Sequence, residues 1–304
     1  MERSGTTWTA TTLRDLLRPP LPRRPPAPPV PRARHGPIGM RSAPISPLDR
    51  SRLLRVGAID IVCSIVNMQL WWMGVTMLQG LNWLQEWHLY FDQTNFIFIA
   101  NEPGTVKSKD DLFTLMKSRD FIQKYVDLIE GQEIRNIVEF GVFEGGSLIL
   151  FNSLLKPKKI VGIDLKLPLE HLDGFIKERG LIDNVSVHYS TSQSDNGKVS
   201  GILDREFGGE PLDLVMDDAS HLFEHSRETF INVFPRVREG GWYVIEDWTA
   251  DYNDGAPLAN LVHKIVDMGA DHRVLNQIVI NANFVAVRKG KAQVTAADLR
   301  DRLA

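Results

Sequence analysis

The chain has 304 residues, of which 43% are hydrophobic and 24% charged, an ordinary composition for a globular protein. Its net charge is −3, but residues 1–56 hold eleven Arg, no Lys and three acids, so the remainder is distinctly acidic. That acidity argues against a body that binds nucleic acid through a basic surface. The single cysteine, Cys63, excludes an internal disulfide and calls for no oxidising compartment, so we expect a cytoplasmic protein.

Residues 1–56 are predicted to be a disordered Pro/Arg-rich tail. Eleven of the seventeen prolines lie between Pro19 and Pro47, and such a segment favours extended, polyproline-like conformations. An Arg-rich, acid-poor start also resembles an organelle transit peptide, although the prolines disfavour the amphipathic helix that such a peptide needs. A third interpretation is extra sequence upstream of a start near Met40.

Residues 57–130 are predicted to be a helical N-terminal region that covers the following domain or contacts another copy in a homo-oligomer. The stretch 61–84 is long enough to span a bilayer, but Asn67, Gln79 and Asn82 interrupt it, and amides are costly at membrane depth. We therefore expect amphipathic helices here and no membrane span. Between 108 and 129 the spacing of the apolar residues also suits a helix.

Residues 131–290 alternate between strand-like and helix-like segments, followed by a short C-terminal tail at 291–304. Strand, crossover helix and strand in repetition predict an α/β fold with a doubly wound, mainly parallel sheet. The last two strands have no helix between them, which predicts an antiparallel hairpin at one edge. The expected strands are 134–141, 158–165, 185–189, 212–218, 241–248 (after a turn at Gly240–Gly241), 274–280 and 283–288; the expected helices end at 155, span 222–237 and span 258–268.

The residues that end the first two strands of this domain point to a nucleoside cofactor. The first strand runs into a glycine-rich turn and a helix whose free N–H groups suit a carboxylate; the turn supplies the candidates Glu139, Gly141, Gly145 and Ser147. Asp164 ends the second strand, where a carboxylate can accept hydrogen bonds from ribose hydroxyls. The dinucleotide pattern G-x-G-x-x-G is absent, and the acids of the turn match a cofactor that carries a sulfonium and an ammonium group.

Four acids end two strands that should be neighbours. Asp217 and Asp218 end the strand at 212–218, and Glu246 and Asp247 end the strand at 241–248. Acids gathered at one crevice would repel one another without a cation, and carboxylates are the ligands that Mg²⁺, Mn²⁺ or Ca²⁺ prefers. The alternative is that these acids cap helices or pair with arginines. His221 lies at the mouth of the same crevice and can accept a proton near neutral pH, and His225 is the rival for that role.

These segments resemble the metal-dependent macrolide-sugar O-methyltransferases of the mycinamicin and macrocin type, a group of class I S-adenosylmethionine (SAM)-dependent methyltransferases. The resemblance rests on IVEFGVFEGGSLILF, IVGIDL, STSQSD and LVMDDASHLFEHSRETFINVFPRVREGGWYVIEDWTADY and covers roughly 130–255. It implies that Asp218, Glu246 and Asp247 hold Mg²⁺, that His221 is the base, and that Gln193 and Asp195 lie near the adenine. Asp217 is assigned to the cofactor side. Two departures, Ala219 in place of the usual glycine and the altered segment after VIED, leave the acceptor open.

The resulting expectation is an enzyme that uses SAM and a divalent metal to methylate a hydroxyl of a small molecule, such as a sugar or another natural-product acceptor. A cephalosporin-hydroxylase-like protein of the same fold is the second hypothesis. A non-catalytic adenosine-binding or membrane-tethered scaffold is the third.

Overall fold

The structure is a computed structural model that describes residues 81–99, 107–249 and 257–304. The predictions for 1–56 and for 57–80 therefore lie outside the described residues. Within the described part of the chain, no helix has the length and apolar character needed to cross a bilayer.

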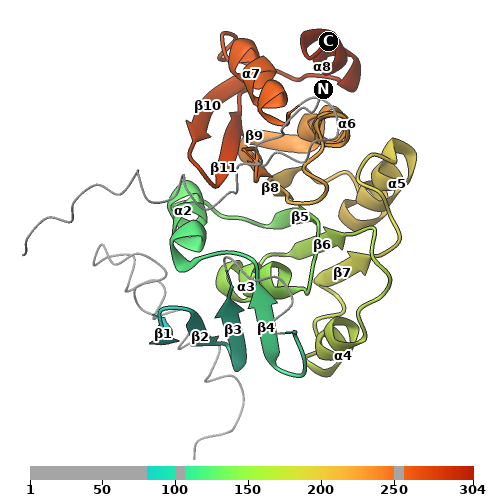
Figure 1. Cartoon of the computed structure of the whole chain (residues 1–304). Helices are drawn as coiled ribbons and strands as arrows, with labels where there is room; N and C mark the ends of the chain where they lie inside the picture. The colour runs from blue at the N-terminus through green and yellow to red at the C-terminus, as the bar shows by residue number, and fades with distance from the viewer. Residues whose placement is uncertain (1–80, 100–106, 250–256) are drawn as a thin grey trace, which may run out of the picture. The chain divides into compact units, whose positions relative to one another are not determined.

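A seven-stranded sheet forms the centre of the predicted domain (Figure 1). Four neighbouring pairs are parallel, and the two pairs at the β10 edge are antiparallel. The mainly parallel sheet and its antiparallel edge hairpin are thus confirmed. In spatial order the strands are β10 (Leu275–Ile280), β11 (Phe284–Lys289), β9 (Val237–Glu246), β8 (Leu212–Asp217), β5 (Asn136–Phe140), β6 (Lys159–Ile163) and β7 (Val185–His188).

Helices bury both faces of this sheet, which explains why every residue of its central strands β5 and β8 is buried. Along β5, Ile137 belongs to one buried cluster and its neighbour Val138 to the other. The first cluster includes α2 (Arg119–Ile129), α3 (Gly146–Leu155) and α4 (Glu170–Glu178). The second includes α5 (Asn196–Phe207), α6 (Phe223–Val233), the short 3₁₀ turn η1 (Phe234–Arg236), α7 (Ala259–Met268) and α8 (Ala296–Arg302).

A second sheet lies within the described part of the region that was predicted to be helical before residue 130. Its four strands follow one another in space as in sequence: β1 (Asn82–Gln85), β2 (His88–Phe91), β3 (Thr94–Phe98) and β4 (Leu112–Leu115). The helical prediction is wrong for these residues and right for α2. Two residues, Asp92 and Gln93, join β2 to β3 with φ of 52° and 58°, the left-handed pair that makes a tight hairpin. Neither residue is a glycine, so the turn carries no obvious sequence signal.

Helix α3 lies against both sheets. Nine of its ten residues are buried, and the helix contacts β4 on one side and β6 on the other. The contact with β4 is close, because a Cβ atom added to Gly146 would lie 2.3 Å from the carbonyl oxygen of Thr114. Only a glycine lets the helix begin at this distance from the strand.

Two boundaries near the C-terminus differ from the prediction. The strand expected after a turn at Gly240–Gly241 begins at Val237 and passes through both glycines, with a shift of register against Leu212 and Leu214. Gly240 has φ of 74°, so the glycines form an irregularity within β9 and not a turn. The expected tail at 291–304 contains α8, whose Leu299 is buried in the second cluster.

Candidate functional site

A cavity of about 550 Å³ opens where β5, β6 and β8 end. Its wall includes Gly141, Asp164, Gln193, His221 and Asp247, which come from five separate strand ends or the loops after them. Open α/β sheets bind ligands at the carboxyl ends of their strands, so the position agrees with the fold. Six of the twelve predicted site residues line this cavity, namely these five and Asp218.

The glycine-rich turn after β5 is shaped by its neighbours in the protein. Gly141 has φ of 85°, and a Cβ atom there would lie 2.0 Å from the carbonyl oxygen of Asp218. Gly145 has φ of 84°, and its Cβ would lie 2.8 Å from a methyl group of Leu172 in α4. Gly141 lines the cavity, whereas the space at Gly145 is limited by the core.

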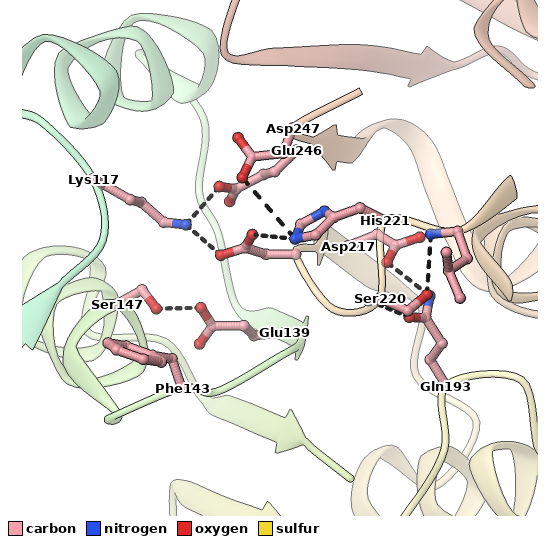
Figure 2. Close-up of polar contacts among 12 residues, drawn as sticks. Lys117, Glu139, Phe143, Ser147, Gln193, Asp217, Ser220, His221, Glu246 and Asp247 are labelled. Atoms are coloured by element: carbon pink, nitrogen blue, oxygen red, sulfur yellow. Dashed lines mark hydrogen bonds and ion pairs between the residues drawn. The ribbon is translucent and has the colours of Figure 1, made fainter. Parts of the chain in front are cut away.

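Glu139 is a fully buried acid beside this turn. Ser147 at the start of α3 donates a hydrogen bond to its Oε1, while Oε2 has no hydrogen-bond partner among the described residues (Figure 2). Burial raises the pKa of Glu139 to about 8, although the nearby Lys117 opposes the shift. A buried acceptor without a donor is costly, so this oxygen fits a cationic or hydrogen-bonding group of a ligand.

Asp164 lines the cavity with both carboxylate oxygens already engaged. Oδ2 accepts hydrogen bonds from the backbone N–H groups of Val142 (2.7 Å) and Phe143 (3.2 Å), and Oδ1 accepts one from that of Lys166 (2.8 Å). The carboxylate therefore ties the end of β6 to the glycine-rich turn. Carboxylate oxygens have further lone pairs, so these bonds leave room for hydroxyl donors.

Gln193 and Asp217 form a buried polar link behind the cavity. The Gln193 side chain donates to Asp217 (2.9 Å) and to Thr229 (3.0 Å), and its oxygen accepts from the backbone N–H of Ser220 (2.8 Å). Tyr243 donates to the other oxygen of Asp217, whose pKa burial raises to about 6. Gln193 reaches the cavity wall, whereas Asp217 lies behind it and holds the loop that carries Ser220 in place.

Asp195 lies apart from these residues. It is exposed and does not line the cavity; its side chain accepts a hydrogen bond from the backbone N–H of Lys198 (3.0 Å) as the N-cap of α5. In the structure its role is that of a helix cap.

Asp218, His221 and Asp247 meet at the opposite side of the cavity. His221 Nε2 lies 3.8 Å from Asp218 Oδ1 and 4.0 Å from Asp247 Oδ2, and one ligand atom from each residue lies within 4.8 Å of the others. His221 and Asp247 also adopt left-handed backbone conformations, with φ of 54° and 48°. Such strain in residues other than glycine is typical of functional sites. Two carboxylates and an imidazole suit a divalent cation.

Glu246, the third predicted metal ligand, is not one of the three residues of this group. It is 1% exposed; Tyr125 donates to its Oε1 (2.7 Å) and the ammonium of Lys117 lies 2.5 Å from its Oε2. Lys117 also lies 2.6 Å from Asp218 Oδ2, between the two carboxylates (Figure 2). Burial opposes a charge on Lys117, but Asp218 and Glu246 hold the pKa of its ammonium above the usual value.

Lys117 and Tyr125 are the residues that the sequence analysis missed. Lys117 lies two residues after the end of β4 and directly before Ser118, the N-cap of α2, while Tyr125 lies within α2. A lone lysine between a strand and a helix has no motif around it. The apolar face of α2 marks Tyr125 only as a core residue.

Comparisons with known proteins relate this chain to methyltransferases. Residues 138–248 match a family described as methyltransferase domain. The mycinamicin VI 2''-O-methyltransferase of Micromonospora griseorubida is 32% identical over 127 residues, or 39% of this chain and 28% of that protein. The demethylmacrocin O-methyltransferase of Streptomyces fradiae is 35% identical over 127 residues, 39% of this chain and 29% of that protein.

Among solved structures, the MycE methyltransferase from the mycinamycin biosynthetic pathway, in complex with Mg, SAH and mycinamycin VI, is 28% identical. That match has a TM-score of 0.44 and covers 57% of this chain and 49% of MycE. The aligned part of this chain spans less than a third of the length of the two curated relatives. The predicted resemblance is confirmed, and this chain contains a methyltransferase domain similar to that of the macrolide-sugar O-methyltransferases.

Proposed function

We propose that this protein is an O-methyltransferase that uses SAM and a divalent cation, Mg²⁺ or Mn²⁺, to methylate a hydroxyl of a small molecule. The observation that carries the proposal is the convergence of Asp218, His221 and Asp247 on one wall of the cavity that also borders Asp164 and Gln193. A single cavity can then hold a nucleoside cofactor beside a polar acceptor.

Three residues support a nucleoside cofactor at one end of the cavity, and each fits a different group of that cofactor. Asp164 fits the ribose hydroxyls, because its carboxylate borders the cavity and keeps lone pairs available. Gln193 fits the rim of the base, and the unpaired oxygen of Glu139 fits the cationic amino group. When bound, SAM supplies an activated methyl group on its sulfonium.

At the acceptor end, Asp218 and Asp247 would hold the cation, with Glu246 available once its own partners release it. The cation supplies charge that lowers the pKa of a bound hydroxyl and fixes its position. His221 would accept the hydroxyl proton at an imidazole nitrogen, and the hydroxyl oxygen would lie in line with the methyl group that bound SAM donates as its carbon–sulfur bond breaks and S-adenosylhomocysteine leaves. Asp217 and Gln193 keep the loop of Ser220 and His221 in position through the hydrogen bond to the Ser220 N–H.

Two further relatives are named for glycosylated acceptors, a rhamnosyl-tetracenomycin-C in one and an L-olivosyl-oleandolide in the other, which makes a glycoside hydroxyl the first acceptor class to test. Calorimetric titration of the full chain with SAM, with and without Mg²⁺, tests the cofactor site. Mass spectrometry of a panel of glycosides and phenols incubated with enzyme, SAM and Mg²⁺ tests the reaction. The proposal is wrong if SAM does not bind, and its metal component is wrong if chelation leaves methyl transfer unchanged.

Two chemical roles are open to His221, that of a base and that of a metal ligand. Measuring both turnover and Mn²⁺ binding of the His221→Ala variant separates them. If His221 is the base, its replacement by alanine removes turnover and leaves Mn²⁺ binding intact. If His221 is a metal ligand, its replacement by alanine weakens Mn²⁺ binding and lowers turnover together. We expect the first result, because Asp218 and Asp247 already supply two carboxylates to the cation.

A further inference from the structure

Lys117 is a buried cation supplied to the acidic site by the other sheet. Its side chain is 4% exposed and its ammonium lies 2.6 Å from Asp218 and 2.5 Å from Glu246. The residue follows β4, the last strand of the four-stranded sheet, whereas both acids end strands of the seven-stranded sheet. The ammonium thus occupies the space between two carboxylates from adjacent strands, β8 and β9.

The acids need this charge when no other cation is present. Glu246 is 1% exposed and Asp218 is 22% exposed, so water alone would solvate the pair poorly. Tyr125 donates a hydrogen bond to the other oxygen of Glu246, so both oxygens of that carboxylate have a donor from the protein. Without a metal, the ammonium of Lys117 therefore offsets part of the negative charge of the two acids.

A divalent ion that bridged Asp218 and Glu246 would need the position that the ammonium holds. Two cations repel strongly at such separations in a site with little water. Asp218 and Asp247 alone can still accept an ion on the cavity side, but with the charge of Asp218 already shared with Lys117. Either way, the ammonium opposes binding of the metal.

We propose that Lys117 is an internal cation that competes with the divalent metal for the Asp218–Glu246 pair, so that the four-stranded sheet sets the metal affinity of the site. This inference rests on the proposed metal-assisted function. It assigns to Lys117 a positioning role: the residue holds the acids together before the metal binds and weakens metal binding by its charge.

The test compares Mn²⁺ binding by the full-length protein and its variants. Lys117→Met removes the charge and keeps much of the side chain's volume; Lys117→Gln is a second variant in case the first does not fold. The matched control is Lys159→Met, which removes one partly buried positive charge from the first residue of β6, where Lys159 pairs with Glu206 (2.9 Å) at the end of the strand opposite Asp164. Free Mn²⁺ is measured by electron paramagnetic resonance, and thermal unfolding is recorded with and without Mn²⁺.

We expect Lys117→Met or Lys117→Gln to bind Mn²⁺ on the order of tenfold more tightly than the wild type, the size of a typical coupling between two binding events. The metal-free variant should unfold at a lower temperature, and Mn²⁺ should raise that temperature more than in the wild type. Lys159→Met should match the wild type in its affinity for Mn²⁺ and in the rise of unfolding temperature that Mn²⁺ produces.

Equal Mn²⁺ affinity in the wild type and both Lys117 variants would overturn the inference and leave Lys117 as a structural ion pair, while the proposed metal site would stand. Loss of Mn²⁺ affinity in the Lys117 variants would overturn it as well. If neither the wild type nor any variant binds Mn²⁺ or Mg²⁺, the metal component of the proposed function fails together with this inference.

Discussion

The two sheets make different contributions to one site. The seven-stranded sheet supplies the acids, the histidine and the cavity, all at the carboxyl ends of its strands. The four-stranded sheet and the helix after it supply Lys117 and Tyr125, which bind the acids from behind. The difference separates residues that face the ligand from residues that control the charge around it. Changes on the first side should alter chemistry, and changes on the second should alter stability and metal affinity.

The largest effect is expected on the seven-stranded side, at His221. Replacing His221 with alanine should lower kcat by about 10²–10⁴-fold, the usual contribution of a general base, while the affinity for SAM is unchanged. His225→Ala is the control, because His225 lines the same cavity and lies farther along the chain in α6. Steady-state methyl transfer and calorimetry give both values. Comparable losses in the two variants would remove the special role of His221.

Glu139→Gln should change both pH dependence and cofactor binding. The pKa of Glu139 is about 8 in the folded protein against an ordinary 4.5, so the folded state binds the proton more tightly than the unfolded state. The stability that Glu139 contributes is present below pH 4.5 and is lost as the pH rises towards 8. Thermal unfolding of the ligand-free protein at pH 5 and pH 8 should show a steeper decrease for the wild type than for the variant.

The glutamine should also weaken SAM binding, because an amide cannot ionise, as Glu139 can, when a cationic amino group lies beside it. Near pH 8 the ligand-free variant should unfold several degrees higher than the wild type, since one pKa unit corresponds to about 1.4 kcal/mol. Parallel pH curves for the two proteins would contradict the buried, uncompensated state of Glu139.

On the four-stranded side, Tyr125→Phe should reduce stability more than catalysis. The change removes the donor to Glu246 Oε1 and leaves a buried carboxylate oxygen unpaired, which costs about 1–3 kcal/mol. The melting temperature should fall by about 2–4 °C per kcal/mol, with kcat changed less than by His221→Ala. A Tyr125→Phe variant of normal stability and much lower kcat would place Tyr125 in the chemistry and break the division between the two sides.

The smallest effect is expected at Asp195. Asp195→Ala removes the N-cap of α5 and should cost about 0.5–2 kcal/mol of unfolding free energy. Its affinity for SAM should equal that of the wild type, because the side chain lies outside the cavity lining. A clear loss of SAM affinity with normal stability would restore the adenine role that the resemblance implies.

The parallel sheet could be predicted from the sequence because its parallel strands are short, largely apolar runs, several of which end at or beside an acidic residue. Asp164, Asp217 and Glu246 all lie at or beside such ends, so the rules for open α/β sheets are enough to place them at one edge. The four-stranded sheet gave no such signal. The apolar residues around Leu112 and Leu115 have a spacing that also fits a helix, and the turn at Asp92–Gln93 lacks glycine.

The position of the Lys117 ammonium beside the acids could not be predicted from the sequence either, and the reason is different. Lys117 is 101 residues from Asp218 and 129 residues from Glu246 in the sequence, and their contact depends on how the two sheets pack. Strand-end rules describe one sheet at a time. They identified the acids and their common crevice, but they say nothing of a lysine that arrives from another sheet, or of Glu246 turning towards it.

The close contact between Gly146 and Thr114 has a consequence for how the site responds to substitutions. Here the first turn of α3 touches the backbone of β4 without a side chain between them, three residues before Lys117. A methyl group at position 146 would act as a wedge that pushes the strand away, and the lysine would be carried with it. A substitution of Gly146 would then move the ammonium of Lys117 and change the charge balance around Asp218 and Glu246, although no charged residue had been replaced.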